Sequence, residues 1–349
     1  MDQRVLAVHF GEPPEPDPTI VRSYLTAIFL QNADLGDPET DEEAREQAAT
    51  LAARRAPGLI EEYEAIGGSP MNAQATDQVA ALETKLEQRG HECGVDLAFQ
   101  FLEPSIESQI QTYADQDIDR LIVLPIYPLC GPSTTVAALE RTQDAVEGYP
   151  DWTTDIVPVS GWHRHPDYLR LRCDMIREFV DEQTYTLTDP STELIFSAHG
   201  TPTHYLQAGS RYQMYVEEFC ETLAKLLGGI DYQLGYQNHE NRDIPWTEPD
   251  VESLVEEVDA DRIVVDPVSF MHEQSETLSE LDIELAEEAT DNGIEFHRVP
   301  VPHDDPRFPS VLLDVIEPFV TDSDPAMYQL RSCDCAATTD AWCLNAPGR

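Results

Sequence analysis

Lysine is almost missing from this sequence, with Lys85 and Lys225 the only two among 349 residues. Lysine and arginine together number 21, against 67 aspartates and glutamates, which gives a formal net charge of −46. Nucleic-acid binding needs clustered basic side chains for the phosphates, so this composition argues against such a partner. Concentrated salt screens the repulsion in so acidic a protein, which predicts a halophilic source and solvated carboxylates over most of the surface.

Long apolar runs are missing as well, and none reaches the roughly 20 residues that a membrane-spanning helix needs. Residues 1–4 lead straight into a short strand-like stretch, without the pattern of a secretory signal. We therefore expect a soluble cytoplasmic protein, a monomer or homodimer, for which peripheral membrane contact stays open. In a reducing compartment its seven cysteines are expected to be thiols or metal ligands rather than disulfides.

Apolar runs alternate with amphipathic segments along the chain, in two rounds of similar length. The strand-like runs are residues 5–10, 95–102, 120–128 and 155–160, then 193–199, 231–237, 262–265 and 294–301. Such alternation predicts an α/β protein with mainly parallel sheets. We expect two similar lobes, residues 1–160 and 161–322, each with a four-stranded parallel sheet flanked by helices, and a tail of residues 323–349.

Three glutamates are spaced four residues apart on a predicted helix after the strand at residues 262–265. Glu276, Glu280 and Glu284 therefore share one helix face. Pro267 cannot donate to a ladder and should end the strand, and open α/β sheets bind ligands at the carboxyl ends of strands. Stacked carboxylates there could pass protons or attract a metal ion. The alternative is a solvated face of a very acidic protein.

Histidines close two of the predicted strands. His199 ends the strand at residues 193–199, and His9, followed by Phe10, ends the first strand. A neutral imidazole is a good ligand for a metal such as Fe(II), and facing a carboxylate it can also move protons. A buried structural role is the alternative for both, and for His9 it is the favoured one.

Polar side chains after other strands are weaker candidates. Hydroxyls near a predicted helix start can cap the helix or bind an acidic group, and they belong to Tyr127, Ser133 and Thr134. A polar loop from Gln237 ends in Trp246. Three further polar residues could belong to a site, but a surface position is the favoured interpretation for each: His239, Arg242 and His272.

Three cysteines lie close together in the tail, at positions 333, 335 and 343. Cys333-x-Cys335 with Cys343 is a metal-binding pattern that suits zinc or an iron–sulfur cluster. A fourth ligand must come from the body of the protein, where Cys93, Cys130, Cys173 and Cys220 are available. The alternative is a disordered tail with incidental thiols.

Seven segments, in this order, resemble the ferrochelatase family. They are Gly11-Glu-Pro13, Ile28-Phe-Leu30, Tyr63-Glu-Ala-Ile-Gly-Gly-Ser-Pro70, residues 124–135, Ser197-Ala-His-Gly-Thr-Pro202, Tyr236-Gln237 with Pro245-Trp246, and Pro267 to Glu284. The resemblance covers roughly residues 4–320. It implies two Rossmann-like lobes with a porphyrin in the cleft between them, and insertion of Fe(II) with release of two protons.

The resemblance also implies roles for individual residues. His199 and Glu276 would face each other across the porphyrin as base and metal-binding groups, with Glu280 and Glu284 as a relay behind them. The substrate contacts would come from His9, Phe10, Tyr127, Ser133, Thr134 and Trp246. Family members with a thiol tail carry a [2Fe-2S] cluster, which points to Cys130 as the fourth ligand beside Cys333, Cys335 and Cys343.

Some functional choices stay open at this stage. The loop of residues 237–246 has the length seen in coproporphyrin-type enzymes, whereas Phe10 replaces their tyrosine and Ile28-Phe-Leu30 resembles the protoporphyrin type. A cobalt or nickel chelatase of a cobalamin-type pathway would share this architecture. A non-enzymatic tetrapyrrole-binding protein would keep the cleft without turnover.

Overall fold

The structure is a computed structural model that describes residues 2–36, 38–116, 118–239, 244–333 and 341–344. Its contacts divide the chain into two compact units. One unit contains Met1–Trp162 together with Pro306–Arg349, and the other contains His163–Asp305. Within the described ranges, no helix is long and apolar enough to cross a membrane. Each unit contains one four-stranded parallel sheet.

The sheet of the first unit has the strand order β2-β1-β3-β4. Its strands are β1 (Gln3–His9), β2 (Gly94–Phe99), β3 (Arg120–Pro125) and β4 (Asp155–Pro158). Val5, Leu6 and Val8 of the central strand β1 are fully buried. A parallel strand covered on both faces reads as a continuous apolar run, which is why the sequence pattern located it.

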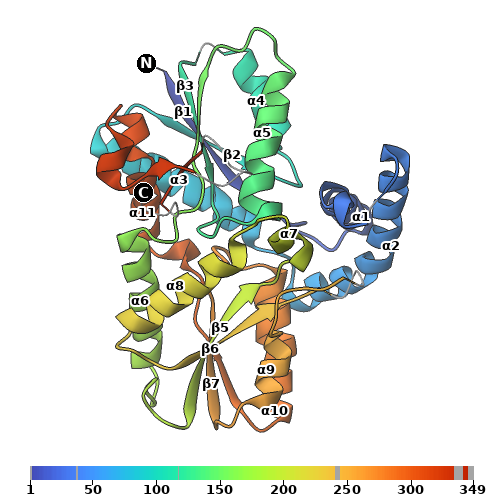
Figure 1. The fold of residues 1–349 in the computed structure, drawn as a ribbon, viewed down its shortest axis with the longest axis vertical. Coiled ribbons are helices and arrows are strands. Elements are labelled where there is room, and N and C mark those ends of the chain that lie inside the picture. Colours follow the sequence, from blue (N-terminus) through green and yellow to red (C-terminus); the bar gives the residue numbers. More distant parts are fainter. Residues whose placement is uncertain (1, 37, 117, 240–243, 334–340, 345–349) are drawn as a thin grey trace. The chain divides into compact units, whose positions relative to one another are not determined.

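Helices cover both faces of this sheet. An apolar core that includes Ile106, Ile110 and Ala138 holds α4 and α5 on one face. On the other side, α3 contacts β2, and α11 contacts both α3 and β3 (Figure 1). The bounds of these helices are α3 (Met71–Arg89), α4 (Ile106–Ala114), α5 (Ala137–Glu147) and α11 (Phe308–Val320). A short π-helix, Pro132–Val136, precedes α5.

Helices α1 (Pro18–Gln31) and α2 (Asp41–Ile66) pack against each other. The acidic stretch of residues 33–50 contains the beginning of α2. Thr40 caps this helix by accepting from the Glu43 backbone N–H. Between residues 44 and 56 of α2 every fourth residue is a buried alanine, and these alanines form a narrow apolar stripe on a helix that is rich in charged residues. They are Ala44, Ala48, Ala52 and Ala56.

The described residues of the tail belong to the first unit. Helix α11 belongs there by its contacts with α3 and β3, whereas the expected boundaries assigned it to residues 161–322. A pair of short antiparallel strands follows, β9 (Arg331–Ser332) and β10 (Trp342–Cys343). Apolar periodicity identifies a helix but does not reveal which sheet the helix covers, so the boundary could not be read from the sequence.

The second unit repeats the topology with the order β6-β5-β7-β8. Its strands are β5 (Thr192–His199), β6 (Tyr232–Gln237), β7 (Arg262–Pro267) and β8 (Glu295–Arg298). Strand β7 ends at Pro267, as the missing N–H predicts. The structure thus confirms the expected α/β class with two four-stranded parallel sheets flanked by helices.

Helices flank the second sheet as well. A core that includes Ile195, Val265 and Leu281 joins the sheet to α9, to the π-helix Glu276–Leu285 and to α10. Helices α6 and α8 pack together on the other side (Figure 1). The bounds are α6 (Pro166–Asp181), α7 (Thr203–Gln207), α8 (Tyr212–Leu226), α9 (Val251–Glu257) and α10 (Ala286–Asp291). Single 3₁₀ turns are Ala33–Gly36, Pro302–Asp304 and Pro325–Tyr328.

Candidate active site

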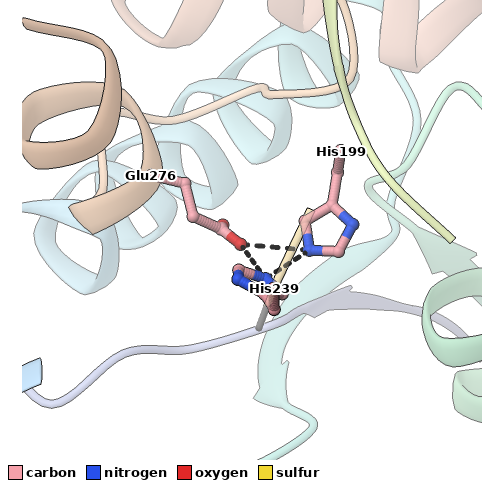
Figure 2. Close-up of side chains that lie close together, drawn as sticks. All are labelled: His199, His239 and Glu276. Carbon is pink, nitrogen blue, oxygen red and sulfur yellow. Dashed lines mark hydrogen bonds and ion pairs between the residues drawn. The ribbon is translucent and has the colours of Figure 1, made fainter. Parts of the chain in front are cut away.

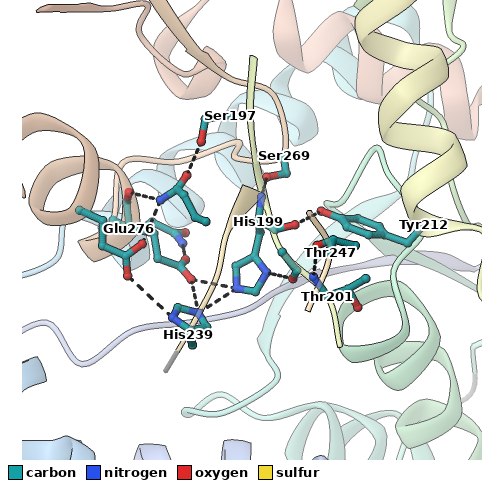
Figure 3. Close-up of polar contacts among 12 residues, drawn as sticks. Ser197, His199, Thr201, Tyr212, His239, Thr247, Ser269 and Glu276 are labelled. Carbon is teal, nitrogen blue, oxygen red and sulfur yellow. Dashed lines mark hydrogen bonds and ion pairs between the residues drawn. The ribbon is translucent and has the colours of Figure 1, made fainter. Parts of the chain in front are cut away.

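His199 is the last residue of strand β5, and hydrogen bonds hold both its backbone and one nitrogen of its ring. Its N–H donates to Ser269 Oγ at 2.8 Å, and its carbonyl accepts from Tyr212 Oη at 2.9 Å (Figure 3). Nδ1 lies 2.5 Å from the Gly200 carbonyl oxygen, an acceptor that places the Nδ1 proton there. This contact leaves Nε2 as the available nitrogen of the ring.

Gly200 lets the ends of β5 and β6 approach each other. A Cβ at this position would meet Asn238 Oδ1 at 1.8 Å and the Gln237 carbonyl oxygen at 2.9 Å. The Gly200 N–H donates to that same carbonyl at 2.7 Å. A glycine is therefore required for the residues after β6 to reach His199.

Glu276 begins the π-helix that follows β7, and its carboxylate faces His199. Oε1 of Glu276 lies 3.1 Å from His199 Nε2 and 3.4 Å from His239 Nε2 (Figure 2). The two Nε2 atoms lie 3.1 Å apart. These three side chains are the single group of potential metal ligands found among the described residues. They come from the ends of β5 and β6 and from the helix after β7.

Gln237 connects this group to the next carboxylate. Its amide Nε2 donates to the Glu276 carbonyl oxygen and to Glu280 Oε2, at 2.9 Å each, and its Oε1 accepts from Ser197 Oγ. Glu276 and Glu280 are thus fixed against the end of β6. Glu284 is exposed and accepts a long hydrogen bond from Ser279 Oγ at 3.5 Å.

The pKa values of the facing pair shift in opposite directions. Burial disfavours a charged imidazole, but the adjacent Glu276 carboxylate outweighs it and raises the pKa of His199 to about 9. Burial would raise the pKa of Glu276, yet His199 and His239 hold it well below its ordinary value. Without a metal ion, the pair therefore exists as an imidazolium facing a carboxylate, a form that stores one proton.

The candidates in the first unit form a local network at the carboxyl end of its sheet. Tyr127 Oη donates to Gln100 Oε1 at 2.6 Å, and Gln100 Nε2 donates to the Ser133 carbonyl oxygen at 3.2 Å. Ser133 Oγ also donates to Asn32 Oδ1 at 2.8 Å. Thr134 Oγ1 donates to the Gly131 carbonyl oxygen at 3.5 Å, so this hydroxyl does not cap the π-helix that follows Gly131.

His9 and Phe10 lie beside this network. His9 is almost fully buried, and that burial lowers its pKa to about 3, so the ring is neutral. Phe10 packs edge-on against Phe101 and Tyr24, with ring centroids 4.7 Å and 6.4 Å away. Phe10 thus belongs to an aromatic cluster of the first unit and is partly buried there.

The tail thiols are placed in the first unit. Cys333 and Cys343 are buried together with Ala341, on and beside the strand pair β9–β10. The tail lies along residues 159–161, because the Ser160 N–H donates to the Trp342 carbonyl oxygen at 2.8 Å. The Trp162 N–H in turn donates to the Pro128 carbonyl oxygen, two residues before the half-buried Cys130. Cys335 lies outside the described residues.

The sequence patterns missed one residue of the site. His239 was interpreted as surface, yet it is half-buried against Glu276 and against the edge of Trp246, whose ring centroid is 5.7 Å away. His272, given the same interpretation, is buried, and Arg242 lies outside the described residues. The useful signal was position, because His239 stands two residues past the end of β6. Only the order β6-β5-β7 turns that position into proximity to His199.

Comparison with known proteins agrees with this architecture. A family model described as Ferrochelatase matches residues 3–319. A ferrochelatase of Synechococcus sp. (strain JA-3-3Ab) is 33% identical over 319 residues, covering 89% of this chain and 88% of that one. A ferrochelatase of Picosynechococcus sp. is 34% identical over 282 residues, covering 78% and 71%.

Solved structures show the same fold at low identity. The cobalt complex of the sirohydrochlorin chelatase SirB from Bacillus subtilis subspecies spizizenii superposes with a TM-score of 0.50 at 12% identity. That alignment covers 92% of this chain and 97% of the chelatase. Residues 3–319, which the Ferrochelatase family model matches, include the elements that carry the His199 site, namely β5, β6, β7 and the π-helix. By the family model and by these relatives, the chain belongs to the ferrochelatase family.

Proposed function

We propose that this protein inserts Fe(II) into a porphyrin at His199 and Glu276, releasing two protons. The observation that carries the assignment is the 3.1 Å contact between His199 Nε2 and Glu276 Oε1, at the carboxyl ends of neighbouring strands. That edge is where open α/β sheets bind their ligands. Family membership supports the reaction, and the geometry supports the choice of these two residues.

The chemistry requires a base and a path for protons. A free porphyrin carries two pyrrole N–H protons, which must leave as the metal ion enters. Bending of the macrocycle on binding would expose the nitrogen lone pairs. The His199–Glu276 pair takes up a pyrrole proton once the proton that it stores has left, and Glu280, held by Gln237, is the next carboxylate to carry that proton outward. Glu284, which is exposed, would be the exit to solvent.

Anaerobic turnover tests the assignment. The purified protein is incubated in concentrated KCl with Fe(II) and either coproporphyrin III or protoporphyrin IX, and the Soret band is followed. The faster substrate shows whether four or two propionates are recognised, with contacts assigned to His9, Phe10, Tyr127, Ser133, Thr134 and Trp246. Competition with Co(II) and Ni(II) tests the alternative of a cobalt or nickel chelatase. Porphyrin binding without turnover would favour a tetrapyrrole-binding protein.

We also propose that Cys130, Cys333, Cys335 and Cys343 hold a [2Fe-2S] cluster in the first unit. The donor set suits such a cluster, because two tail thiols are buried together and the tail lies along the segment bonded to Pro128. Cys173 and Cys220 are buried on helices α6 and α8 of the second unit, which makes them poorer fourth ligands. When bound, the cluster would supply an electron-transfer centre or a structural cross-link.

Iron and sulfide analysis of anaerobically purified protein, with EPR after reduction, tests the cluster. Cys130→Ser, Cys333→Ser, Cys335→Ser and Cys343→Ser should each lose it, whereas Cys173→Ser is the matched control. Stoichiometric zinc without sulfide would replace the proposal with a structural zinc site.

The acidic composition supports a further proposal, that the protein works in a salt-rich cytoplasm as a monomer or homodimer. With a net charge of −46, self-repulsion should be strong unless salt screens it. Unfolding midpoints recorded over a KCl series should rise steeply with salt. Sedimentation in the same buffers gives the oligomeric state.

A further inference from the structure

We propose that His239 is a third metal ligand, which with His199 and Glu276 forms a docking site for Fe(II) before the ion enters the porphyrin. The inference rests on the proposed function of the same site and adds a residue and a step to it. His239 follows β6, so each of three neighbouring chain segments contributes one ligand.

The spacing of the three ligand atoms fits one first-row metal ion. The distances between them are 3.1, 3.1 and 3.4 Å. Bonds of about 2.0–2.2 Å place neighbouring ligand atoms about 3.0 Å apart in an octahedral site and about 3.4 Å apart in a tetrahedral one. The three atoms therefore surround a point at bonding distance from all of them.

The remaining polar atom of each proposed ligand faces an outer partner. His199 Nδ1 faces the Gly200 carbonyl oxygen at 2.5 Å, and His239 Nδ1 faces Glu280 Oε1 at 4.0 Å. Glu276 Oε2 accepts from the Gln274 amide, which leaves Oε1 for the ion. Metal-ligating histidines are normally oriented this way, with the second nitrogen directed at a carbonyl or carboxylate.

The donor set indicates the class of ion. Two imidazole nitrogens and one carboxylate oxygen suit Fe(II), Co(II), Ni(II) and Zn(II), and they suit Mg²⁺ and Ca²⁺ poorly. Three ligands on one side of the ion leave its other positions open for water and then for pyrrole nitrogens. On docking, the hydrated ion exchanges three waters for three side-chain atoms, the Nε2 proton of His199 leaves to solvent, and no electron is transferred.

Cobalt binding to the porphyrin-free protein tests the inference. Co(II) is titrated anaerobically, with the dissociation constant measured by competition and the ligands identified by paramagnetic NMR. Each histidine bound through Nε2 keeps an Nδ1 proton, so the wild type should show two strongly shifted exchangeable signals. His239→Ala should show one and bind Co(II) at least about tenfold more weakly, since removing even outer partners of ligands costs 10–100-fold.

The variants separate a ligand from a structural residue. His239→Asp restores a ligand and should regain much of the affinity, whereas His204→Ala changes an exposed histidine on α7 and should match the wild type. Wild-type affinity and two shifted signals in His239→Ala would overturn the proposal. So would equal weakening by His239→Ala and His239→Asp with unchanged circular dichroism.

Porphyrin turnover distinguishes this inference from the proposed function. If His239→Ala binds Co(II) like the wild type while His199→Ala abolishes Fe(II) insertion, the docking role of His239 is wrong and the function stands. If both His199→Ala and Glu276→Gln insert Fe(II) normally, the functional assignment of the site fails. Iron dependence of turnover adds a readout, because loss of a docking ligand should raise the KM for Fe(II) more than it lowers kcat.

Discussion

The amide of Gln237 donates to the Glu280 carboxylate across 2.9 Å, and the same nitrogen donates to the Glu276 carbonyl oxygen. This side chain ties the end of β6 to the first turns of the π-helix. It thereby holds the backbone of Glu276, the residue whose carboxylate faces His199. π-helical segments inside helices are frequent at functional sites, and here one carries both Glu276 and Glu280.

Replacing Gln237 should slow iron insertion through misplacement of Glu276 and Glu280. Gln237→Leu removes hydrogen bonds to a charged partner, which are worth about 1.5–3 kcal/mol, so kcat should fall by about tenfold or more. Gln237→Glu brings a like charge to Glu280 and should be at least as slow. Steady-state turnover with saturating Fe(II) measures both. A KM effect with unchanged kcat would contradict the positioning role.

Loss of either facing residue should nearly abolish turnover. His199→Ala and Glu276→Gln each remove a group that accepts protons, and such a group contributes about 10²- to 10⁴-fold. Porphyrin should still bind, as its quenching of protein fluorescence would report. Glu287→Gln, at an exposed position on α10, is the matched control. A loss below tenfold in either variant would remove that residue from the mechanism.

The relay predicts graded effects along the π-helix. Glu280→Gln should slow turnover clearly, because Glu280 shares the Gln237 bridge with Glu276. Glu284→Gln should have a smaller effect, since that carboxylate is exposed and solvent can replace it. Solvent isotope effects on single-turnover rates report the proton step. If both variants behave like Glu287→Gln, these carboxylates only solvate the surface.

The His199–Glu276 pair should make stability depend on pH. The pKa of His199 is raised from its ordinary value of 6.5 to about 9, so folding favours the protonated ring. Its stabilising contribution is therefore complete below pH about 6.5 and is lost as the pH rises through about 9. Urea unfolding from pH 6 to 10 should show this loss in the wild type and not in Glu276→Gln. The lowered pKa of Glu276 has the opposite effect, because its stabilising contribution is lost as the pH falls into the acid range.

A buried ion pair in the second unit should be important for stability. Arg172 of α6 and Asp266 of β7 are both fully buried and bonded to each other. Asp266→Asn leaves the guanidinium charge unpaired, a change that typically costs about 3–5 kcal/mol. Guanidinium chloride unfolding measures this cost. Removal of the exposed Arg170–Asp167 pair on the same helix should change stability little.

The sequence alone determined the fold class and most elements, because buried parallel strands are continuous apolar runs and their helices are amphipathic. It also determined that His199 and the glutamates from Glu276 onward follow strands, where ligands bind. The resemblance to ferrochelatases named the facing pair, and local pattern placed the tail cysteines together. These conclusions depend on neighbours in the chain, which a sequence displays directly.

Only the tertiary structure decided which strand ends meet. The order β6-β5-β7 brings His239 and Gln237 to His199 and Glu276, although β6 and the π-helix are separated by α9 and β7 in the chain. The π form of the helix and the packing of α11 in the first unit were likewise decided by long-range contacts. Strand order depends on how the faces of helices and sheets pack against each other, and this packing cannot be predicted from local periodicity.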